Sequence, residues 1–554
     1  MKKLWLLASV VGLCCGPAMA QTMDELLNDG KNTDNVLTLS MGFTRQNYSP
    51  LNQINKSSVK RLVPVWSTSL MNDMGELAAP VVHNGVIYAI NGKWTFAIDV
   101  ETGQQIWRTP VQVEAGNARA TSAINRGAPA IYNGKLFRVT VDNYIVALDM
   151  KTGRVVWTKK FADWKEGYYA TSAPIVANGV LISGMAGGES TTRGFLDGWD
   201  PETGEKLWRR YTIPAPGEPG SETWPTDSDA WKYGGGPTWR SGSYDPELDL
   251  VYWGTGNAEP YDPRPRGALD SLYTSSVLAI RPKTGEIVCH YQFTPNDVYD
   301  VDGTDDLVLA DMQVNGQTRK VMIQSNKNGF MYVVDRTNCK LVAAHPYTRV
   351  NWATGIDLAS GRPQLTGVYK DFLAGEEVQI FPTRGTNAVP LAYNPNKGLI
   401  YAAPWDLPRI QKLAPPKQQV IGETSTGVVA RQPEIKPDDV VGYFIAFDPL
   451  TGQRKWEVPL KGMGSSAGML ATGGGIVFTG KLTGEFVALD EDTGKTLWQF
   501  KTSSSVNATP ITYTHKGQQY VTVASGLGGN GAKRAAGAKV PTGGSVWTFA
   551  LMPE

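Results

Sequence analysis

One short phrase recurs along the 554-residue chain: Asp, two residues, Thr-Gly, three residues, Trp. Five complete copies begin at Asp99, Asp149, Asp200, Asp448 and Asp490. Two eroded copies occupy residues 281–289 and 335–339. The first three copies are spaced 50 and 51 residues apart, and a fixed period of this length indicates a repeat architecture.

Each copy of the phrase has a mechanical interpretation. The apolar runs before it, such as residues 96–98 and 146–148, suit buried strands. Asp then opens a turn, Gly tolerates a positive φ, and a second strand carries the Trp toward the next sheet. Such a unit does not bury its own faces, so neighbouring units must stack. With about four strands per unit, a stack that closes on itself is an all-β propeller.

The N-terminus predicts export of the protein. Lys2 and Lys3 precede an apolar stretch at 4–13, and Ala18-Met19-Ala20 resembles a cleavage site. We expect residues 1–20 to be a cleaved signal peptide and residues 21–554 a single propeller domain in the bacterial periplasm. The adjacent Cys14 and Cys15 leave a lipoprotein as the alternative. No later run of about 20 apolar residues predicts a membrane span.

The mature chain carries 51 basic and 52 acidic residues, which gives no basic stripe for nucleic acid. Its two cysteines, Cys289 and Cys339, lie in the eroded repeats and are either paired or free buried thiols. Short helices are expected at 23–29 and 59–61. Trp66 and Trp547 resemble partial copies of the phrase, so we expect the last strand to complete a sheet begun at the other end.

Polar residues gather where the repeats stop being alike. The gaps between successive copies lengthen to 81 residues after Asp200 and to 113 residues after Asp335. In and beside them lie phrases that contain four oxygen-donor residues suited to Ca²⁺ or a trivalent ion: Glu189, Asn257, Asp300 and Asp302. Residues i and i+2 of an extended strand face one side, so Asp300 and Asp302 are expected to converge on one charge. Ordinary turns and a solvated face are the alternatives.

At these phrases the chain resembles the pyrroloquinoline quinone (PQQ) dependent methanol/ethanol dehydrogenase family. The resemblance runs from about Asn47 to the C-terminus and implies an eight-bladed propeller. The phrases that carry it are Asn125-Arg126-Gly127, Lys165-Glu166-Gly167-Tyr168, Gly187-Gly188-Glu189, Gly254-Thr255-Gly256-Asn257, Asp300-x-Asp302-Gly303 and Lys327-Asn328-Gly329.

The resemblance implies a role for each matching position. Glu189, Asn257 and Asp300 resemble the metal ligands, and Asp300 also resembles the catalytic base. Trp239 looks like the aromatic floor under the quinone. The other positions that match cofactor contacts are Arg126, Thr171, Gly187, Gly188, Glu189, Lys327 and Asn387. Glu76 is near a glutamate that some members use on the cofactor.

The implied chemistry is oxidation of an alcohol. PQQ accepts two electrons, and the protein binds, orients and polarises it. A metal ion acts as a Lewis acid on the C5 carbonyl, while Asp300 takes the hydroxyl proton as hydride passes to C5. The chain has no Cys-x-x-Cys-His motif for a fused haem, so the resemblance implies a separate periplasmic cytochrome c as electron acceptor.

Two departures from the family pattern concern the metal and the cofactor. An Asp two residues after the base, here Asp302, looks like the mark of lanthanide-using members. A fourth anionic ligand stabilises a bound trivalent ion more than it stabilises bound Ca²⁺. We therefore predict one lanthanide ion, with Ca²⁺ as the alternative. Many relatives carry adjacent cysteines that cover one face of PQQ, where this chain has Ala120 and Thr121.

A third departure concerns the substrate pocket. Ala388 follows Asn387, and Ser466 and Leu527 stand where relatives often carry Trp, while Tyr299 precedes the base. Smaller groups leave volume, which predicts a primary or secondary alcohol bulkier than methanol or ethanol. An insert around 405–417 is the alternative, because it would refill this space.

Two other functions compete with this interpretation. A non-catalytic propeller scaffold of the outer-membrane assembly type would have similar repeats but no ligand set. A PQQ-dependent sugar or polyol dehydrogenase would share the cofactor. The sequence leaves the oligomeric state open between monomer and homodimer.

Overall fold

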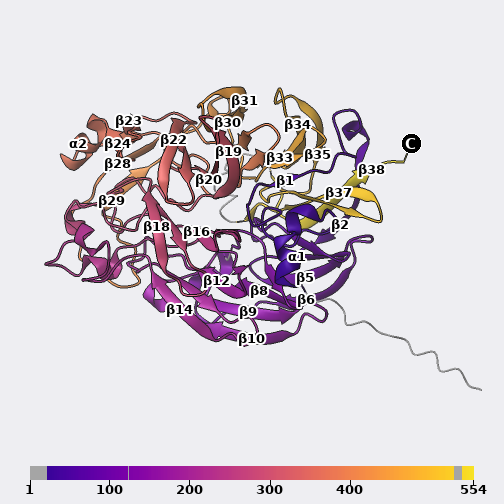
Figure 1. Cartoon of the computed structure of the whole chain (residues 1–554), viewed down its shortest axis with the longest axis horizontal. Helices are drawn as coiled ribbons and strands as arrows, with labels where there is room; N and C mark the ends of the chain where they lie inside the picture. The colour runs from indigo at the N-terminus through magenta and orange to yellow at the C-terminus, as the bar shows by residue number, and fades with distance from the viewer. Residues whose placement is uncertain (1–20, 123, 529–539, 554) are drawn as a thin grey trace, which may run out of the picture.

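The computed structural model describes residues 21–122, 124–528 and 540–553, and the predicted signal peptide lies outside them. The described residues form eight sheets of four or five strands arranged as a ring (Figure 1). The strands of the first four sheets are β3 (Val81–His83), β4 (Val86–Ile90), β5 (Trp94–Asp99), β6 (Gln105–Pro110); β7 (Ala130–Tyr132), β8 (Lys135–Val139), β9 (Tyr144–Asp149), β10 (Val155–Lys160); β11 (Ile175–Ala177), β12 (Val180–Gly184), β13 (Phe195–Trp199), β14 (Lys206–Tyr211); β15 (Ser243–Asp245), β16 (Leu250–Gly254), β17 (Ser276–Ile280) and β18 (Ile287–Gln292).

The other four sheets continue around the ring. Their strands are β19 (Val308–Val314), β20 (Gln317–Ser325), β21 (Phe330–Asp335), β22 (Lys340–Pro346); β26 (Ala392–Asn394), β27 (Leu399–Ala402), β30 (Val440–Phe447), β31 (Arg454–Lys461); β1 (Tyr48–Ser49), β32 (Leu470–Thr472), β33 (Ile476–Gly480), β34 (Glu485–Asp490), β35 (Thr496–Lys501); β2 (Leu62–Ser69), β36 (Ile511–His515), β37 (Gln518–Ser525) and β38 (Ser545–Leu551). The predicted eight-bladed all-β propeller is confirmed.

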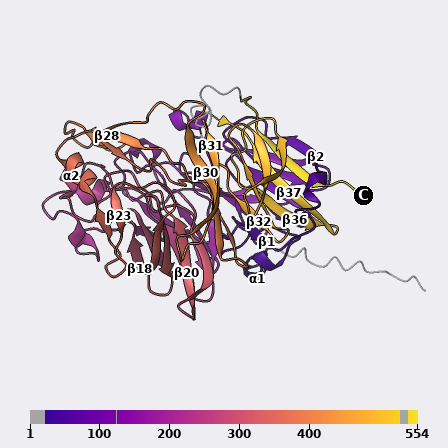
Figure 2. The ribbon, with the colours of Figure 1, turned by 90° about the horizontal axis from the view of Figure 1, so that it is seen from above.

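The two ends of the chain close the ring. Strand β38 lies between β37 and β2, pairing antiparallel with β2 from Leu62 against Leu551 to Ser69 against Ser545. In Figure 1 the indigo and yellow parts of the ribbon accordingly lie side by side on the right of the ring, and Figure 2 shows the same neighbourhood from above. The expectation that the terminal strand completes a sheet begun at the other end is correct.

The repeated phrase joins each blade to the next. Asp99 accepts hydrogen bonds from the Thr102 backbone amide and hydroxyl, which fixes the turn. The Trp107 indole donates to the Met150 carbonyl of the next blade at 3.0 Å, and its ring covers Gly153 so closely that a Cβ there would lie 2.5 Å away. The same docking recurs for Trp66, Trp157, Trp208, Trp456 and Trp498, which donate to carbonyls of Val100, Pro201, Pro282, Glu491 and Leu62. Trp547 lies in β38 and donates to Ser545 instead.

The eroded copies replace this docking with a covalent bond. Cys289 occupies the Trp position of its copy and Cys339 the Gly position of the next, with φ at 58°. The two form a disulfide between adjacent blades, so of the two alternatives the paired cysteines are the correct one. Because Cys289 stands at the Trp position, its disulfide with Cys339 replaces the Trp-on-Gly contact that joins other neighbouring blades.

Helices are few and lie outside the blades. The predicted helices appear as α1 (Met23–Leu27) and the 3-10 turn Val59–Arg61. The long gap after Asp335 holds an insert made of β23 (Ala353–Ile356), β24 (Pro363–Leu365), α2 (Gly367–Leu373), β25 (Val378–Ile380), β28 (Arg409–Leu413) and β29 (Val428–Arg431). Among the described residues, no helix is long and apolar enough to cross a membrane.

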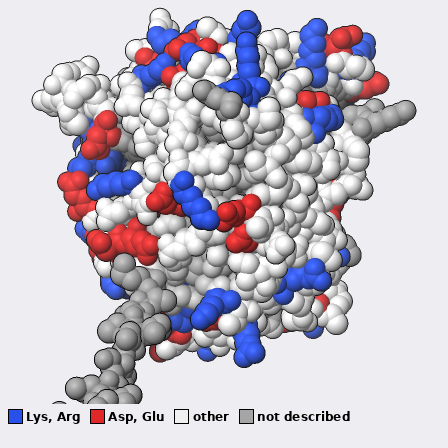
Figure 3. Space-filling view, turned by 90° about the vertical axis from the view of Figure 1, so that its right-hand side faces the viewer, with Lys and Arg blue, Asp and Glu red and all other residues white. Residues whose placement is uncertain are grey.

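Buried aliphatic and aromatic side chains fill the spaces between successive sheets, which leaves the loops at one end free to form a site. The molecular face in Figure 3 carries Lys, Arg, Asp and Glu interspersed around uncharged areas. This mixture agrees with the balanced composition and shows no single-sign stripe on that face.

Candidate active site

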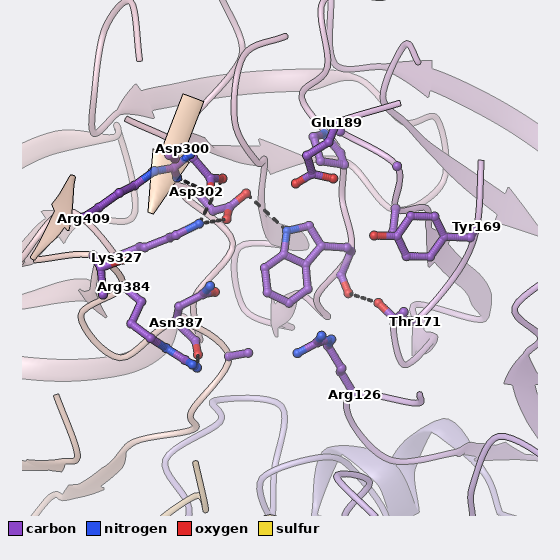
Figure 4. Close-up of a pocket in the computed structure, with 18 of the residues that line it drawn as sticks. Arg126, Tyr169, Thr171, Glu189, Asp300, Asp302, Lys327, Arg384, Asn387 and Arg409 are labelled. Carbon is purple, nitrogen blue, oxygen red and sulfur yellow. Dashed lines mark hydrogen bonds and ion pairs between the residues drawn. The ribbon is translucent and has the colours of Figure 1, made fainter. Parts of the chain in front are cut away.

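A polar cavity of about 550 Å³ collects most of the predicted site residues. Its volume falls within the range of small-molecule sites, about 300–1,000 Å³. Figure 4 shows Lys327, Arg384 and Arg409 on one side of it, with Glu189, Tyr169 and Thr171 on the other. The predicted residues that line it are Arg126, Thr171, Gly187, Gly188, Glu189, Trp239, Asp300, Asp302, Lys327 and Asn387.

Asn257 lies just behind the lining. Its backbone amide donates to Asp302 Oδ1 at 3.1 Å. Its side-chain oxygen lies 2.7 Å from the position that a Cβ on Gly188 would occupy. Glycine at 188 is therefore required for the Asn257 side chain to reach the cavity wall.

The segment that carries the two aspartates is held by a buried carboxylate. Asp297 accepts from the backbone amides of Tyr299 at 2.8 Å and Val301 at 3.0 Å. Asp300 adopts a positive φ of 61° in an irregular segment. The expected convergence of Asp300 and Asp302 is found, but the extended strand invoked for it is wrong, because a turn rather than strand alternation turns both side chains to one side.

Both aspartates meet the same ammonium group. Lys327 Nζ lies 3.0 Å from Asp300 Oδ1 and 2.9 Å from Asp302 Oδ2, and Arg409 Nη1 lies 2.8 Å from Asp300 Oδ2. Burial alone would raise the pKa of Asp300, but Lys327 and Arg409 outweigh it and lower the pKa. Burial likewise opposes the charge of Lys327, yet the two aspartates raise its pKa. The site thus keeps Asp300 ionised.

Glu189 faces this pair and forms no ion pair with a cation of the described residues. Burial, followed by the charges of Asp300 and Asp302, raises the pKa of Glu189 to about 7. Within the described residues no three His, Cys, Asp or Glu side chains are close enough together to form a ready-made metal cluster. The site nevertheless contains four hard oxygen donors: the carboxylates of Asp300, Asp302 and Glu189 and the side-chain oxygen of Asn257. An added cation would attract all four.

The floor of the cavity is aromatic, and the part of its wall formed by Gly187 and Gly188 has no side chains. The Trp239 indole donates to Asp302 Oδ1 at 3.3 Å, and the Arg126 guanidinium carbon lies 5.1 Å from the Trp239 ring centroid. A Cβ on Gly188 would come within 2.8 Å of Pro237. A planar ligand stacked on Trp239 would therefore lie beside the glycine backbone and near the Arg126 guanidinium.

The structure also shows what the sequence interpretation missed. Arg384, Arg409 and Arg431 line the cavity, and all three come from the insert and the loops around it. Of the insert around 405–417, Arg409 lines the cavity, and the position of this insert was its only signal in the sequence.

Only one of the residues cited for extra pocket volume lines the cavity. Ala388 lines the cavity, whereas Tyr299, Ser466 and Leu527 are not part of its lining. Glu76 is also outside the lining, buried beside Asn91.

Comparison with known proteins identifies the family. Residues 40–350 and 457–521 match the PQQ family model, described as the glucose/ethanol/alcohol dehydrogenase β-propeller domain. The quinoprotein alcohol dehydrogenase PedH of Pseudomonas putida is 36% identical over 574 residues, which cover 96% of this chain and 93% of PedH. The quinohemoprotein alcohol dehydrogenase ADH IIB of the same species is 38% identical, covering 88% of this chain and 72% of its own length.

A solved europium-containing methanol dehydrogenase agrees with this fold at a TM-score of 0.88 and 30% identity, over 95% of this chain and all of the other. The chain belongs to the PQQ-dependent alcohol dehydrogenase family. It is an enzyme of the quinoprotein class, and this family membership excludes the non-catalytic scaffold.

The cavity fits the cofactor of that family. Asn387 Oδ1 is buried and has no hydrogen-bond partner in the described part of the chain, so a ligand with donor groups would satisfy it. The Trp239 floor and the Gly187-Gly188 wall suit a flat heterocycle, and Arg126 and Lys327 suit its carboxylates and quinone oxygens.

Proposed function

We propose that this enzyme oxidises a primary or secondary alcohol larger than ethanol to the aldehyde or ketone, with Asp300 as general base. The observation that carries the proposal is the convergence of Asp300 and Asp302 on one cation beside Trp239. Bound PQQ supplies the two-electron acceptor, and a metal ion supplies Lewis acidity.

The protein's own groups account for the remaining steps. Arg126, Lys327 and Asn387 would orient the quinone, while Glu189, Asn257, Asp300 and Asp302 would hold the metal. Asp300, kept ionised by its cationic neighbours, would take the hydroxyl proton as the carbinol carbon gives up its hydride.

The metal in this proposal is a lanthanide ion. Asp302 offers a fourth anionic ligand, and a trivalent ion gains more from it than Ca²⁺ does. The structurally similar methanol dehydrogenase contains europium, which supports the same choice. Residues 1–20 would direct the chain to the periplasm, where a separate cytochrome c would accept the electrons.

Reconstitution tests the cofactor and the metal together. Metal-free protein is loaded with PQQ and with La³⁺, Ce³⁺ or Ca²⁺, and dye-linked oxidation is measured on methanol, ethanol, benzyl alcohols, secondary alcohols and aldoses. We expect activity with La³⁺ or Ce³⁺ and larger alcohols. Restoration by Ca²⁺ alone would overturn the lanthanide assignment, methanol as the best substrate would overturn the size assignment, and a preference for aldoses would favour a sugar dehydrogenase.

Asp302 gives the metal assignment a direct variant. Asp302→Ala should weaken lanthanide binding by about tenfold or more, because it removes one charged ligand. Terbium luminescence titration of the PQQ-loaded protein measures this without any turnover. Equal affinities in the two proteins would show that Asp302 is not a ligand.

A further inference from the structure

The cavity carries more positive than negative side chains. Five cationic groups line it against three carboxylates. The cationic residues are Arg126, Lys327, Arg384, Arg409 and Arg431, and the carboxylates are Glu189, Asp300 and Asp302. A bound metal would add positive charge, and the three carboxylates of PQQ would add negative charge of similar size. The excess of arginine therefore remains after both have bound.

The excess lies on one wall. Arg126 and Lys327 belong to the blades and face the expected cofactor position, whereas Arg384, Arg409 and Arg431 come from the insert after Asp335 and its flanking loop. Figure 4 shows Arg384 and Arg409 on the same side, with Arg409 reaching to Asp300. A substrate hydroxyl that contacts Asp300 would thus have this wall beside it.

Arg409 has hydrogen-bonding capacity left over. Its Nη1 contacts the Asp300 carboxylate at 2.8 Å and the Tyr299 carbonyl at 3.3 Å. Its Nε is buried and has no partner among the described residues. A buried donor without an acceptor is costly, and a carboxylate placed edge-on to a guanidinium satisfies two donors at once.

The outer arginine is placed to attract an anion. Arg431 has a side chain that is 59% exposed and pairs with Glu377 at 2.7 Å. An exposed pair of this kind is weak, so a carboxylate inside the cavity can compete with Glu377 for the Arg431 guanidinium. Arg384 is closer in, beside the Asn387 carbonyl at 3.1 Å.

We propose that the substrate is an alcohol that carries a carboxylate, with its hydroxyl on Asp300 and its carboxylate on the wall formed by Arg409, Arg384 and Arg431. This inference rests on the proposed function and narrows its substrate class. The carboxylate takes no part in the chemistry, since the carbinol carbon loses the hydride and the hydroxyl loses the proton. Its role is to bind and to orient the carbinol carbon.

Three alcohols of equal size and different charge test it on the PQQ- and metal-loaded enzyme: 4-(hydroxymethyl)benzoate, 4-(hydroxymethyl)benzamide and 4-(aminomethyl)benzyl alcohol. We expect kcat/KM for the benzoate to exceed that for the amide by about tenfold or more, and the amine to be the poorest. The advantage of the benzoate should shrink with added salt.

Variants assign the effect to the wall. Arg409→Gln and Arg431→Gln should each lower the benzoate-to-amide ratio of kcat/KM, Arg409→Gln more strongly because it removes the buried donors. Arg362→Gln is the matched control, since Arg362 is similarly exposed at 54%, is paired with Asp270 and lies outside the cavity lining. It should leave the ratio unchanged. The PQQ content of each variant, read by absorbance, verifies that the cofactor is retained.

Binding of 4-methylbenzoate, which has no hydroxyl to oxidise, supplies a readout without turnover. Calorimetry should show binding that weakens in Arg409→Gln. If the benzoate and the amide are oxidised equally well, this inference fails while alcohol oxidation stands. If no alcohol is oxidised but 4-methylbenzoate binds in an Arg409-dependent way, the anion site stands and the proposed function fails.

Discussion

Asp300 illustrates how much a single side chain depends on its neighbours. Lys327 and Arg409 hold it ionised at the cost of occupying both of its oxygens. A bound metal would compete with these cations for the same carboxylate. In the proposed mechanism Asp300 is both a metal ligand and the base, and Lys327 and Arg409 would balance its charge before a metal binds.

Replacing the base gives the sharpest test at this scale. Asp300→Asn should lower kcat by roughly 10²- to 10⁴-fold, because the amide does not accept the hydroxyl proton. Steady-state turnover per bound PQQ is the measurement. Asp245→Asn is the control, since Asp245 is also buried and paired with an arginine, Arg336, but does not line the cavity. Equal turnover in Asp300→Asn and the wild type would remove Asp300 from the mechanism.

Glu76 predicts a dependence of stability on pH. Burial raises its pKa from 4.5 to about 8; its Oε1 accepts from Met74 and Asn91, while its Oε2 has no partner in the described structure. As pH rises, the unfolded chain loses this proton first and the folded chain keeps it, so stability is lost between about pH 4.5 and 8, by about 1.4 kcal/mol per unit.

Glu76→Gln mimics the protonated form and should remove this loss. Its unfolding midpoint in urea should match the wild type near pH 4.5 and exceed it increasingly up to pH 8. Parallel curves for the two proteins over this range would show that Glu76 is ionised in the folded state.

At the scale of elements, the sequence predicted the repeats better than the site. Trp107 and Gly153 both belong to copies of one short sequence phrase, so their docking can be predicted from the sequence alone. Arg409 instead reaches Asp300 from a sheet that lies 109 residues away in the chain and matches no repeat. The convergence of Asp300 and Asp302 was predicted for a strand and arises from a turn held by Asp297, which accepts from two nearby backbone amides. Residue spacing alone does not distinguish this turn from a strand.

The disulfide allows the docking phrase itself to be tested. Cys289→Ala with Cys339→Gly removes the bond, and Cys289→Trp with Cys339→Gly rebuilds the phrase used by the other blades. The first double variant should lose about 2–4 kcal/mol of stability. The second should recover part of it, because the indole regains a glycine to cover, as Trp208 covers Gly285.

Thermal unfolding of both double variants, and of the wild type with reductant, measures the effect. The reduced wild type should approach the alanine variant. Identical midpoints for the Ala and Trp variants would show that the space between these two blades does not accept the docking geometry.

At the scale of the whole molecule, the ring makes the site depend on a remote closure. Loops from blades far apart in sequence, carrying Arg126, Lys327 and Asn387, meet in one cavity only if the ring is closed. Strand β38 provides that closure by pairing with both β2 and β37, and it buries Val546, Thr548, Phe549 and Ala550 completely. The binding geometry and the last strand of the chain are thus parts of one cooperative structure.

Truncation after Gly544 removes β38 and should open the ring, whereas truncation after Met552 keeps β38 and the bond from the Met552 amide to the Arg61 carbonyl. We expect the shorter chain to elute earlier in size-exclusion chromatography, to lose its single cooperative unfolding transition and to bind no PQQ. The longer chain should behave as the wild type in all three measurements. A cooperative, PQQ-binding protein ending at Gly544 would mean that β2 and β37 close the ring on their own, because only their direct pairing would then replace the missing strand.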